Sequence, residues 1–540
     1  MEKNMESMAA GAIVSGGDNL YPNLPYKVPE EVQRRTSSAK PELFHKIAPA
    51  SFLYAVFFTF CLYKNASGIA YPFYVAGTIG FAVYTIRKSG ISWKGGHILT
   101  LAASLMLGIS NCFTDNAKII AMNKVWLFVL MAYFLLAVYF DTKSWQLGKF
   151  LKSILRLAIG SIGKMFSFFP DTQAWLEEHK GTKNSRALYV LAGTGISIPL
   201  IAVVLVMLSS ADMIFRESMR VLFGNLDGWD VICCIFWSAV MFFFSYGMAS
   251  FLEGRELSET VGDHRKGQPV IAISATAVIA VIYSYFCVIQ VVYLFAGYGT
   301  LPTGYTYAQY ARQGFFQLLF ICLMNLVLVL TGIGFFRESR ILKGILLVIS
   351  GCTFIMTASS AYRMLLYISV YYLTFLRIFV LWALGVIALL LMGIIGKTLK
   401  NSFPLFRYGL CVITVCYLVL SFGQPDYWIA RYNISAYLEG GEGKAEEERI
   451  NPDTWYLRGL SADAAPIILS EANLEQYDAY LEQQEKWKNA ANTGGRGQEY
   501  MDSQTWYISY IARHAERAEK MSLRSYNFSR GYVRRTLDRN

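Results

Sequence analysis

The sequence predicts an all-α membrane protein: a polytopic transmembrane helix bundle followed by a small C-terminal helical domain outside the bilayer. Hydrophobic residues make up 54% of the 540 residues and charged residues only 16%, which is too apolar for a soluble protein of this length. The apolar residues form continuous runs, and a helix needs about 20 such residues to cross the hydrocarbon core. Continuous runs also favour helices over barrel strands.

The chain has three parts, and the middle part contains about eleven apolar segments. We expect residues 1–46 to form a polar, disordered tail, residues 47–423 the transmembrane domain, and residues 424–540 a helical soluble domain. The expected spans are Ile47–Tyr63, Ile69–Ile86, His97–Phe113, Ile119–Phe140, Ala187–Leu208, Val231–Leu252, Ile271–Phe295, Phe315–Ile333, Ile341–Ser359, Arg377–Ile395 and Phe406–Phe422.

Lys and Arg are distributed unevenly among the loops that join these spans. The N-terminal flank and every second loop after it carry the larger numbers, most of all the fourth loop, between Lys143 and Arg186. The positive-inside rule places these loops in the cytoplasm. We therefore expect a multi-pass plasma-membrane protein with a cytoplasmic N-terminus and an extracytoplasmic C-terminal domain. Lys124 interrupts the fourth span near its start. If this segment did not cross the membrane, the predicted orientation of every later span would be inverted.

The fourth loop contains a basic amphipathic stretch, Trp145–Phe169. Its cations recur at helical spacing, and apolar residues fill much of the remaining surface. Such a helix lies in the membrane interface with its cations among anionic headgroups. It could act as a lipid sensor or a docking helix for a partner protein, or it could simply pad the bundle. The candidate headgroup contacts are Lys149, Lys152, Arg156 and Lys164.

The net charge of +11 also suggests anionic lipid rather than nucleic acid, because the basic residues are dispersed among loops. The nine cysteines lie in or beside apolar segments, the five histidines are scattered, and neither type has metal-site spacing. We expect no metal and no cofactor. Gln290 and Asn325 are the deepest polar residues in the spans, where such side chains usually form interhelical hydrogen bonds.

Four patterned stretches fall on the predicted outer face: Leu208–Met219, Leu301–Leu318, Ala361–Arg377 and the tail that opens with Gln424–Leu438. The second stretch begins with a turn signal, carries several tyrosines suited to the headgroup layer, and ends with an arginine just before the eighth span. It serves either as an interfacial anchor and helix start, or as part of an aromatic and arginine pocket for an anionic external ligand.

These stretches resemble the bacterial membrane protein family known as domain of unknown function 4153/4173. The matching residues are Ser210, Ala211, Asp212 and Phe215; Gly304, Thr306, Tyr307, Ala308, Tyr310, Ala311, Arg312, Gly314, Phe315 and Phe316; Tyr362, Arg363, Leu366, Tyr367, Leu373, Thr374, Leu376 and Arg377; and, in the tail, Asn433, Leu460–Ala464, Pro466, Asn527, Ser529 and Arg530. The resemblance extends from about Ala187 to the C-terminus and implies a fold and a topology, not an activity.

The chain departs from that family pattern at three positions. Relatives tend to have Glu where this chain has Gln309 and Gln317, and Gly where it has Tyr372. A general acid or base at the two Gln positions is therefore not expected here.

We take the outer aromatic and arginine layer as the candidate ligand site. Its residues are Asp212, Tyr307, Tyr310, Arg312, Arg363 and Arg377. Asp212 is either the counter-ion of the arginines or a simple helix-end residue. The favoured function is binding or scaffolding in cell-envelope physiology, with an envelope ligand or a membrane protein as partner. The alternatives are a transporter for a small or lipidic solute and a membrane-embedded enzyme acting on envelope lipid or glycan. An enzyme is the less expected class, since no carboxylate or metal cluster is evident.

Overall fold

The computed structural model describes residues 41–91, 97–142, 145–178, 228–254, 267–292, 315–441, 454–470, 473–482 and 506–538, together with isolated positions between 193 and 265. Within these residues the chain is helical, and the only β-type pairing is a single bridge between Gly267 and Phe336. The prediction of an all-α fold is therefore confirmed for the described part. The predicted polar tail lies almost entirely outside it.

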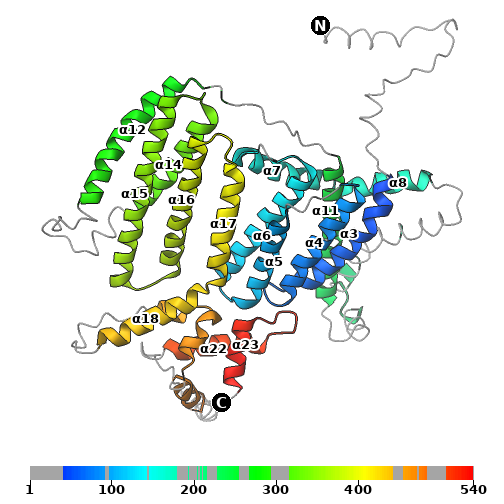
Figure 1. Cartoon of the computed structure of the whole chain (residues 1–540). Helices are drawn as coiled ribbons and strands as arrows, with labels where there is room; N and C mark the ends of the chain where they lie inside the picture. The colour runs from blue at the N-terminus through cyan, green and yellow to red at the C-terminus, as the bar shows by residue number, and fades with distance from the viewer. Residues whose placement is uncertain are drawn as a thin grey trace, which may run out of the picture.

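The long helices form two adjacent groups (Figure 1). The first group contains α3 (Pro41–Leu62), α4 (Ala70–Lys88), α5 (Ile98–Phe113), α6 (Ala117–Tyr139) and α11 (Gly228–Glu253). The second contains α12 (Pro269–Gln290), α14 (Phe315–Phe335), α15 (Arg340–Tyr371), α16 (Phe375–Leu399) and α17 (Leu405–Phe422). Helix α17 packs against α5 and so joins the groups.

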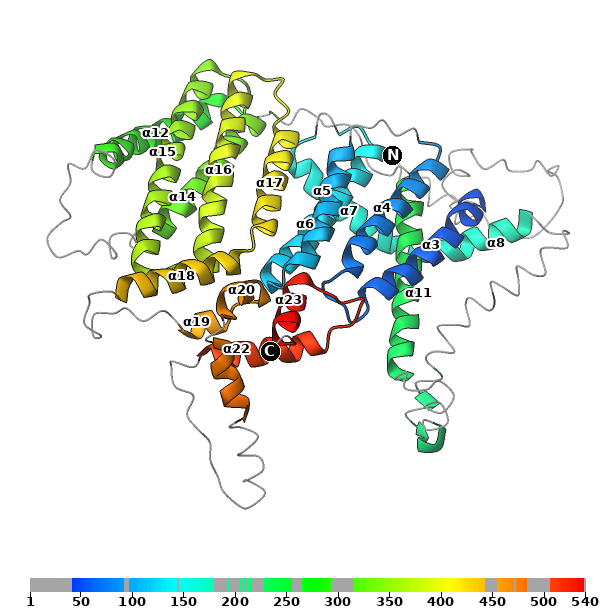
Figure 2. The same ribbon diagram turned by 60° about the horizontal axis from the view of Figure 1, so that its bottom comes forward.

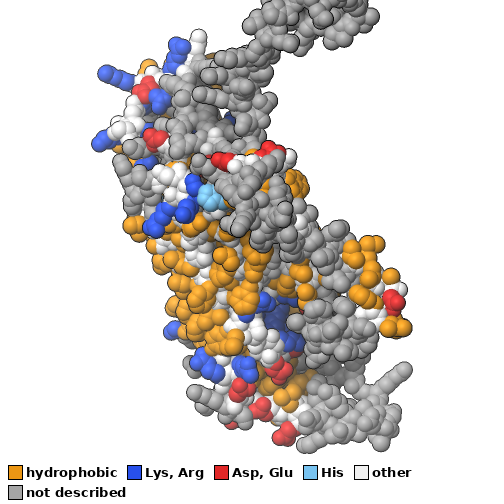
Figure 3. Space-filling view, turned by 90° about the vertical axis from the view of Figure 1, so that its right-hand side faces the viewer, with side chains coloured by type: hydrophobic (Ala, Val, Ile, Leu, Met, Phe, Trp, Pro, Cys, Tyr) orange, Lys and Arg blue, Asp and Glu red, His pale blue; other side chains and the backbone are white. Residues whose placement is uncertain are grey.

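Eight of the described helices are long and apolar enough to cross a membrane by length and composition: α3, α6, α11, α12, α14, α15, α16 and α17. Helices α4 and α5 coincide with two further predicted spans, and α5 is a shorter apolar helix. On the face shown in Figure 3, hydrophobic side chains form a band between ends that carry charged residues. The chain is therefore a multi-pass membrane protein. The predicted span Ala187–Leu208 lies outside the described residues apart from isolated positions.

Lys124 does not prevent α6 from qualifying as a span, since Ala117–Tyr139 is among the eight candidates. Its ammonium group lies 5.9 Å from the centre of the Tyr71 ring on α4, and a cation over an aromatic face is stabilised electrostatically. At the start of α6, the Asn116 side chain accepts hydrogen bonds from the backbone N–H groups of Lys118 and Ile119, an N-cap that fixes where the helix begins.

The seam between the two groups is polar. The Asn123 amide oxygen accepts hydrogen bonds from Tyr417 at 2.6 Å and Ser421 at 2.7 Å, and its nitrogen donates to the Asn111 side chain at 3.0 Å. Ser110 and Ser421 lie 2.6 Å apart between their hydroxyl oxygens. These buried hydrogen bonds fix the register of the neighbouring helices, and within the cluster Nδ2 of Asn111 is left without a hydrogen-bond partner.

The bundle has two distinct ends (Figures 1 and 2). The end that carries the C-terminal helices, here called the tail end, includes the α3–α4, α5–α6 and α15–α16 turns. The opposite end, called the α7 end, carries α7 (Leu147–Gly163), η2 (Met165–Ser167) and α8 (Phe168–Glu178). Among the loops that the structure describes, those predicted to share one side of the membrane lie at one end.

Two predicted elements differ from the structure in length. The ninth connection, predicted as a loop over 360–376, is helical as far as Tyr371, and Arg363 within it donates to Gln290 inside the bundle. The amphipathic stretch Trp145–Phe169 is not one helix: α7 ends at Gly163, and residues 168–169 begin α8. Gly163 is a weak helix former at that break.

The C-terminal segment consists of α18 (Pro425–Gly441), α19 (Thr454–Arg458), η5 (Ala462–Ala464), α20 (Ala465–Ile468), α22 (Trp506–Glu519) and α23 (Phe528–Leu537). Residues 506–537 do not form one long helix, because the chain turns between α22 and α23. Asn527 begins α23 by accepting hydrogen bonds from the N–H groups of Ser529 and Arg530. One hydrophobic core includes buried residues of both this segment and α5, α6, α16 and α17.

Candidate ligand-binding site at the tail end

A cavity of about 250 Å³ opens between α14, α15 and α16 at the tail end. Most of its lining belongs to the stretches that resemble the family pattern. The lining residues are Phe315, Phe316, Met364, Tyr367, Thr374, Leu376, Arg377 and Val380. The walls are mainly apolar, with one cation and two hydroxyl groups, which is the usual composition of a site for a small amphiphilic ligand.

The three helices hold this cavity through a small core beneath it. Phe315 starts α14 and is buried with Ile368 of α15 and Leu384 of α16. The α15–α16 turn then brings Thr374 and Arg377 to the cavity in the first turn of α16.

Arg377 is fixed by the end of α15. Its Nη1 donates to the backbone carbonyl oxygens of Tyr371 and Tyr372, and its guanidinium carbon lies 4.5 Å from the centre of the Tyr367 ring. The carbonyls at a helix C-terminus attract a cation, and the aromatic face adds to that attraction. Nε and Nη2 carry further N–H donors that could bind a carboxylate or phosphate.

Tyr372 has a backbone conformation that favours glycine, with φ of 64° and ψ of −177°. This region is essentially restricted to glycine, and a residue with a Cβ pays about 1–3 kcal/mol to occupy it. The turn itself explains why the family resemblance implies glycine at this position. The strained turn also points the two carbonyl groups at Arg377.

The C-terminal segment supports the same turn. The Asn433 amide on α18 accepts a hydrogen bond from the Leu373 N–H at 2.8 Å and donates to the Leu373 carbonyl at 2.9 Å. The Tyr456 hydroxyl accepts from the Phe375 N–H at 2.7 Å. Asn433, singled out from the sequence only by family resemblance, thus positions the turn that carries Arg377.

Of the other candidate residues that the structure describes, neither Arg363 nor Asp212 joins Arg377 in the cavity lining. Arg363 lies in α15 and is only 6% exposed. Its Nη2 donates to Oε1 of Gln290 on α12 at 3.2 Å, and the Ser359 hydroxyl donates to the same oxygen at 2.6 Å. The expectation that Arg363 lies in an external loop is wrong. Gln290 and Asn325 do form interhelical hydrogen bonds, as predicted.

Asp212 is exposed, and its Oδ1 accepts hydrogen bonds from the N–H groups of Ile214 at 2.7 Å and Phe215 at 3.1 Å. It caps its own turn, which matches the simpler of the two interpretations from the sequence. Tyr307, Tyr310 and Arg312 lie outside the described residues. Of the residues nominated from sequence, the structure therefore places Arg377 alone in the lining of the described cavity.

Sequence reasoning missed a second buried site, at the α5–α6 turn. The Asp463 carboxylate accepts hydrogen bonds from the Thr114 hydroxyl at 2.6 Å and from the Asp115 N–H at 2.7 Å. Arg530 donates from Nε to Oδ1 of Asp115 at 2.6 Å. Asp463 and Arg530 are among the C-terminal residues that match the family pattern in the sequence analysis. A carboxylate in a short turn between two apolar runs, as at Asp115, is the sequence signal that could have revealed their partner.

Burial shifts the acid–base properties of this second site. Burial raises the pKa of the Asp463 carboxyl from 3.8 to about 6, against the lowering effect of its hydrogen bonds to Thr114 and Asp115. Burial lowers the pKa of His514 from 6.5 to about 4. The His514 Nε2 lies 3.0 Å from the Leu460 carbonyl, and its Nδ1 lies 4.0 Å from Oδ2 of Asp115. The network fastens the segment to the bundle.

A third polar turn joins the segment to α3 and α4. Arg524 donates to the carbonyl oxygens of Phe60 at 2.7 Å and Tyr63 at 2.9 Å, at the C-terminus of α3. Gly68 has φ of +117°, and an added Cβ would lie 2.7 Å from the Ser525 backbone. Glycine is required there because the two backbones touch. The segment therefore contacts turns of both helix groups.

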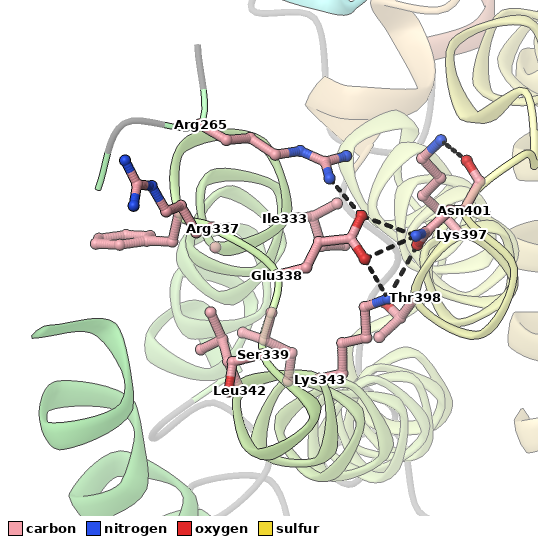
Figure 4. Close-up of a pocket in the computed structure, with 13 residues that line it drawn as sticks. Arg265, Ile333, Arg337, Glu338, Ser339, Leu342, Lys343, Lys397, Thr398 and Asn401 are labelled. Carbon is pink, nitrogen blue, oxygen red and sulfur yellow. Dashed lines mark hydrogen bonds and ion pairs between the residues drawn. The ribbon is translucent and has the colours of Figure 1, made fainter. Parts of the chain in front are cut away.

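The α7 end contains a smaller cavity beside a single carboxylate (Figure 4). Glu338 pairs with Arg265 at 2.5 Å and Lys343 at 3.0 Å, and Asn401 donates to both of its oxygens at 2.8 Å. These contacts lower the pKa of Glu338 to about 2. Because the carboxylate is already saturated by its neighbours, the cluster ties the helix ends together. The candidate lipid contacts Lys149, Lys152, Arg156 and Lys164 also lie at this end, on α7 and at its C-terminus.

Among the described residues, no group of three or more His, Cys, Asp or Glu side chains could hold a metal ion. Neither a curated protein nor a solved structure matches the chain. One family does match, over residues 101–471, which is more than half of the chain. The matched region begins within α5, earlier than the resemblance was expected to start, and so includes the Thr114–Asp115 turn as well as the whole cavity lining. It ends at residue 471, so it does not include Asn527, Ser529 and Arg530, to which the resemblance was expected to extend. The chain therefore belongs to the family described as domain of unknown function DUF4153.

Proposed function

We propose that this membrane protein binds an anionic amphiphile of the cell envelope in the cavity between α14, α15 and α16. The observation that carries the proposal is the position of Arg377 in a largely apolar cavity lined by family-pattern residues. The guanidinium would pair with a phosphate or carboxylate. The aromatic and aliphatic walls would take the apolar part of the ligand.

The proposal also assigns the two ends of the bundle to the two sides of the membrane. The turns at the α7 end carry more Lys and Arg than the turns at the tail end, so the positive-inside rule favours a cytoplasmic α7 end. The cavity and residues 424–540 would then face the outside of the plasma membrane. The C-terminal segment would act as a scaffold that holds the α15–α16 turn, and with it Arg377, in the binding geometry.

The test is lipid binding by the purified full-length chain. Native mass spectrometry would compare short-chain phosphatidylglycerol with phosphatidylcholine of the same chain length. A hydrogen bond to a charged group contributes about 1.5–3 kcal/mol, so Arg377→Ala should weaken phosphatidylglycerol binding by roughly ten- to a hundredfold and leave phosphatidylcholine unchanged. Arg431→Ala is the matched control, since Arg431 lies on α18 at the same end and stacks on Trp428 rather than lining the cavity. Equal binding by the Arg377→Ala and unmutated proteins would refute the proposal.

A lipid transporter is the second candidate, favoured by one observation. Arg363 is a cation buried inside a span, a position that usually marks a functional pathway, and the adjacent Met364 lines the cavity. Proteoliposomes that contain fluorescent phosphatidylglycerol would test it by dithionite reduction of the outer leaflet. Transport requires protein-dependent loss of the protected fluorescence, slowed in Arg363→Gln. A protected fraction identical to that of protein-free vesicles excludes this candidate.

A further inference from the structure

Helix α7 presents three different faces. Its buried face, formed by Phe150, Ser153, Leu157 and Ser161, packs against the bundle, mainly against α11. The contact is close: an added Cβ at Gly247 of α11 would lie 2.6 Å from the Ser161 carbonyl oxygen. Helix α7 is therefore fixed to the bundle along one side only.

A second face of α7 is apolar and points away from the bundle. Its residues repeat at helical spacing and are between 54% and 67% exposed: Leu147, Leu151, Leu155, Ile159 and Ile162, followed by Phe166 just beyond the helix. Large apolar residues in water are tolerated singly, but a contiguous stripe marks a surface that another apolar phase covers.

The third face is cationic. At 100° per residue, Lys152 and Arg156 fall beside the apolar stripe, on the side away from the buried face, and Lys149 continues this edge. Lys152 and Arg156 are exposed. Lys149 is half-buried, with its ammonium 5.7 Å from the Trp145 ring. No Asp or Glu occurs between Leu147 and Lys164, so this edge complements a negatively charged surface.

The position of α7 matches the boundary of a bilayer. It lies across the α7 end of the bundle rather than along the spans (Figure 1). Gly160 of α7 packs against Phe251 in the last turn of α11, so closely that an added Cβ at Gly160 would overlap the Phe251 ring. The apolar stripe is therefore level with the ends of the spans. An interfacial helix has the same arrangement, with an apolar face at the acyl boundary and cations at the headgroups.

We propose that α7 binds the surface of a leaflet rich in anionic phospholipid, with its apolar stripe among the acyl chains and Lys149, Lys152 and Arg156 among the headgroup phosphates. This surface is at the opposite end from the cavity and does not depend on the function proposed for it. Each cation near an anionic leaflet contributes about 1 kcal/mol, a factor of roughly five in the equilibrium between bound and released helix.

Hydrogen exchange of the full-length protein in nanodiscs tests the proposal. The discs contain phosphatidylcholine alone or a mixture with 40% phosphatidylglycerol, and the readout is the amide protection of residues 147–163. Protection should be higher in the anionic discs by roughly tenfold to a hundredfold. The Lys149→Gln, Lys152→Gln, Arg156→Gln triple variant should lose this difference. The matched control neutralises three cations of the C-terminal segment, Arg517→Gln, Lys520→Gln and Arg534→Gln, and should keep it.

A second variant tests the apolar stripe. Leu151→Ser, Leu155→Ser and Ile159→Ser change only exposed side chains, so they would be nearly neutral if α7 faced water. Burial in the acyl region predicts a loss of protection in both kinds of disc. Protection that ignores lipid charge, an equal loss in the matched control, or an unchanged serine variant would each overturn the proposal. A surface reserved for a protein partner would give the first of these results.

Discussion

Replacing Asp463 by asparagine should make the docking of the C-terminal segment dependent on pH. In the unmutated protein two buried groups oppose each other. The pKa of Asp463 is raised to about 6, so its contribution to docking is fully present below 3.8 and is lost as the pH rises through about 6. The pKa of His514 is lowered to about 4, so its contribution is present above 6.5 and is lost as the pH falls through about 4.

The magnitudes follow from these pKa values. Between pH 7.5 and 4.5, Asp463 favours docking at the lower pH by about 2 kcal/mol, and His514 disfavours it there by about 2 to 3 kcal/mol. The two contributions nearly cancel, so the free energy of docking changes little between these two pH values. In Asp463→Asn only the histidine contribution remains, because an amide does not titrate in this range. The asparagine can still accept from the Asp115 N–H and donate to the Thr114 hydroxyl, so the variant keeps the local hydrogen bonds.

The assay is amide protection of α23, measured by hydrogen exchange in nanodiscs and corrected for the intrinsic effect of pH on exchange. For Asp463→Asn, protection should be roughly seventyfold lower at pH 4.5 than at pH 7.5. For His514→Gln the dependence should reverse, with about thirtyfold higher protection at pH 4.5. The unmutated segment should change by less than about fivefold. If all three proteins show the same pH profile, these two groups do not control docking and the reasoning fails.

Three further predictions concern single contacts. Tyr372→Gly should raise the thermal unfolding temperature, since relief of the strained φ outweighs the added flexibility of glycine by about 1 kcal/mol. The control Tyr371→Gly changes the neighbouring residue of the regular helix and should lower that temperature. A lower unfolding temperature for both variants would contradict the strain argument. Arg530→Met leaves the carboxylate of Asp115 buried without its cation and should cost about 3 kcal/mol of docking free energy, seen as faster proteolysis of the C-terminal segment. Glu338 has a pKa of about 2, so its ion pairs should persist at every pH above 4.5 and weaken only as the pH falls through about 2. Glu338→Gln should lower the stability of the protein by less than about 1 kcal/mol at neutral pH, because the pairs are partly exposed. A loss of stability near pH 6 in the unmutated protein would contradict this assignment.

The spans were predictable from sequence because a lipid-facing helix must be apolar along its whole length. The apolar run of α12 or α14 therefore identifies the helix without knowledge of its neighbours. The same criterion ended the predicted ninth span at Ser359, before the polar Arg363. Its partner Gln290 is on α12, so only the packing of the two helices shows why α15 continues.

The candidate site was predictable in part. Family resemblance selected Arg377, and the structure explains its position through the carbonyls of a turn that Asn433 holds from α18. The position of Asp115 in a short turn between two apolar runs was visible in the sequence, but its burial and its partners were not, because a carboxylate in such a turn is usually solvated. Its burial depends on residues 463, 514 and 530, more than three hundred positions later in the chain.

This separation has a consequence for biogenesis. The α3–α4 and α5–α6 turns leave the translocation machinery early, but Arg524, Asn527 and Arg530 lie about four hundred residues later in the chain. Until they arrive, the carboxylate of Asp115 and the carbonyls at the end of α3 can bond only to water. Assembly of the two helix groups is thus completed only after α22 and α23 have been synthesised. A protein truncated before α23 would insert its spans normally and still present an unfinished surface that proteases can recognise.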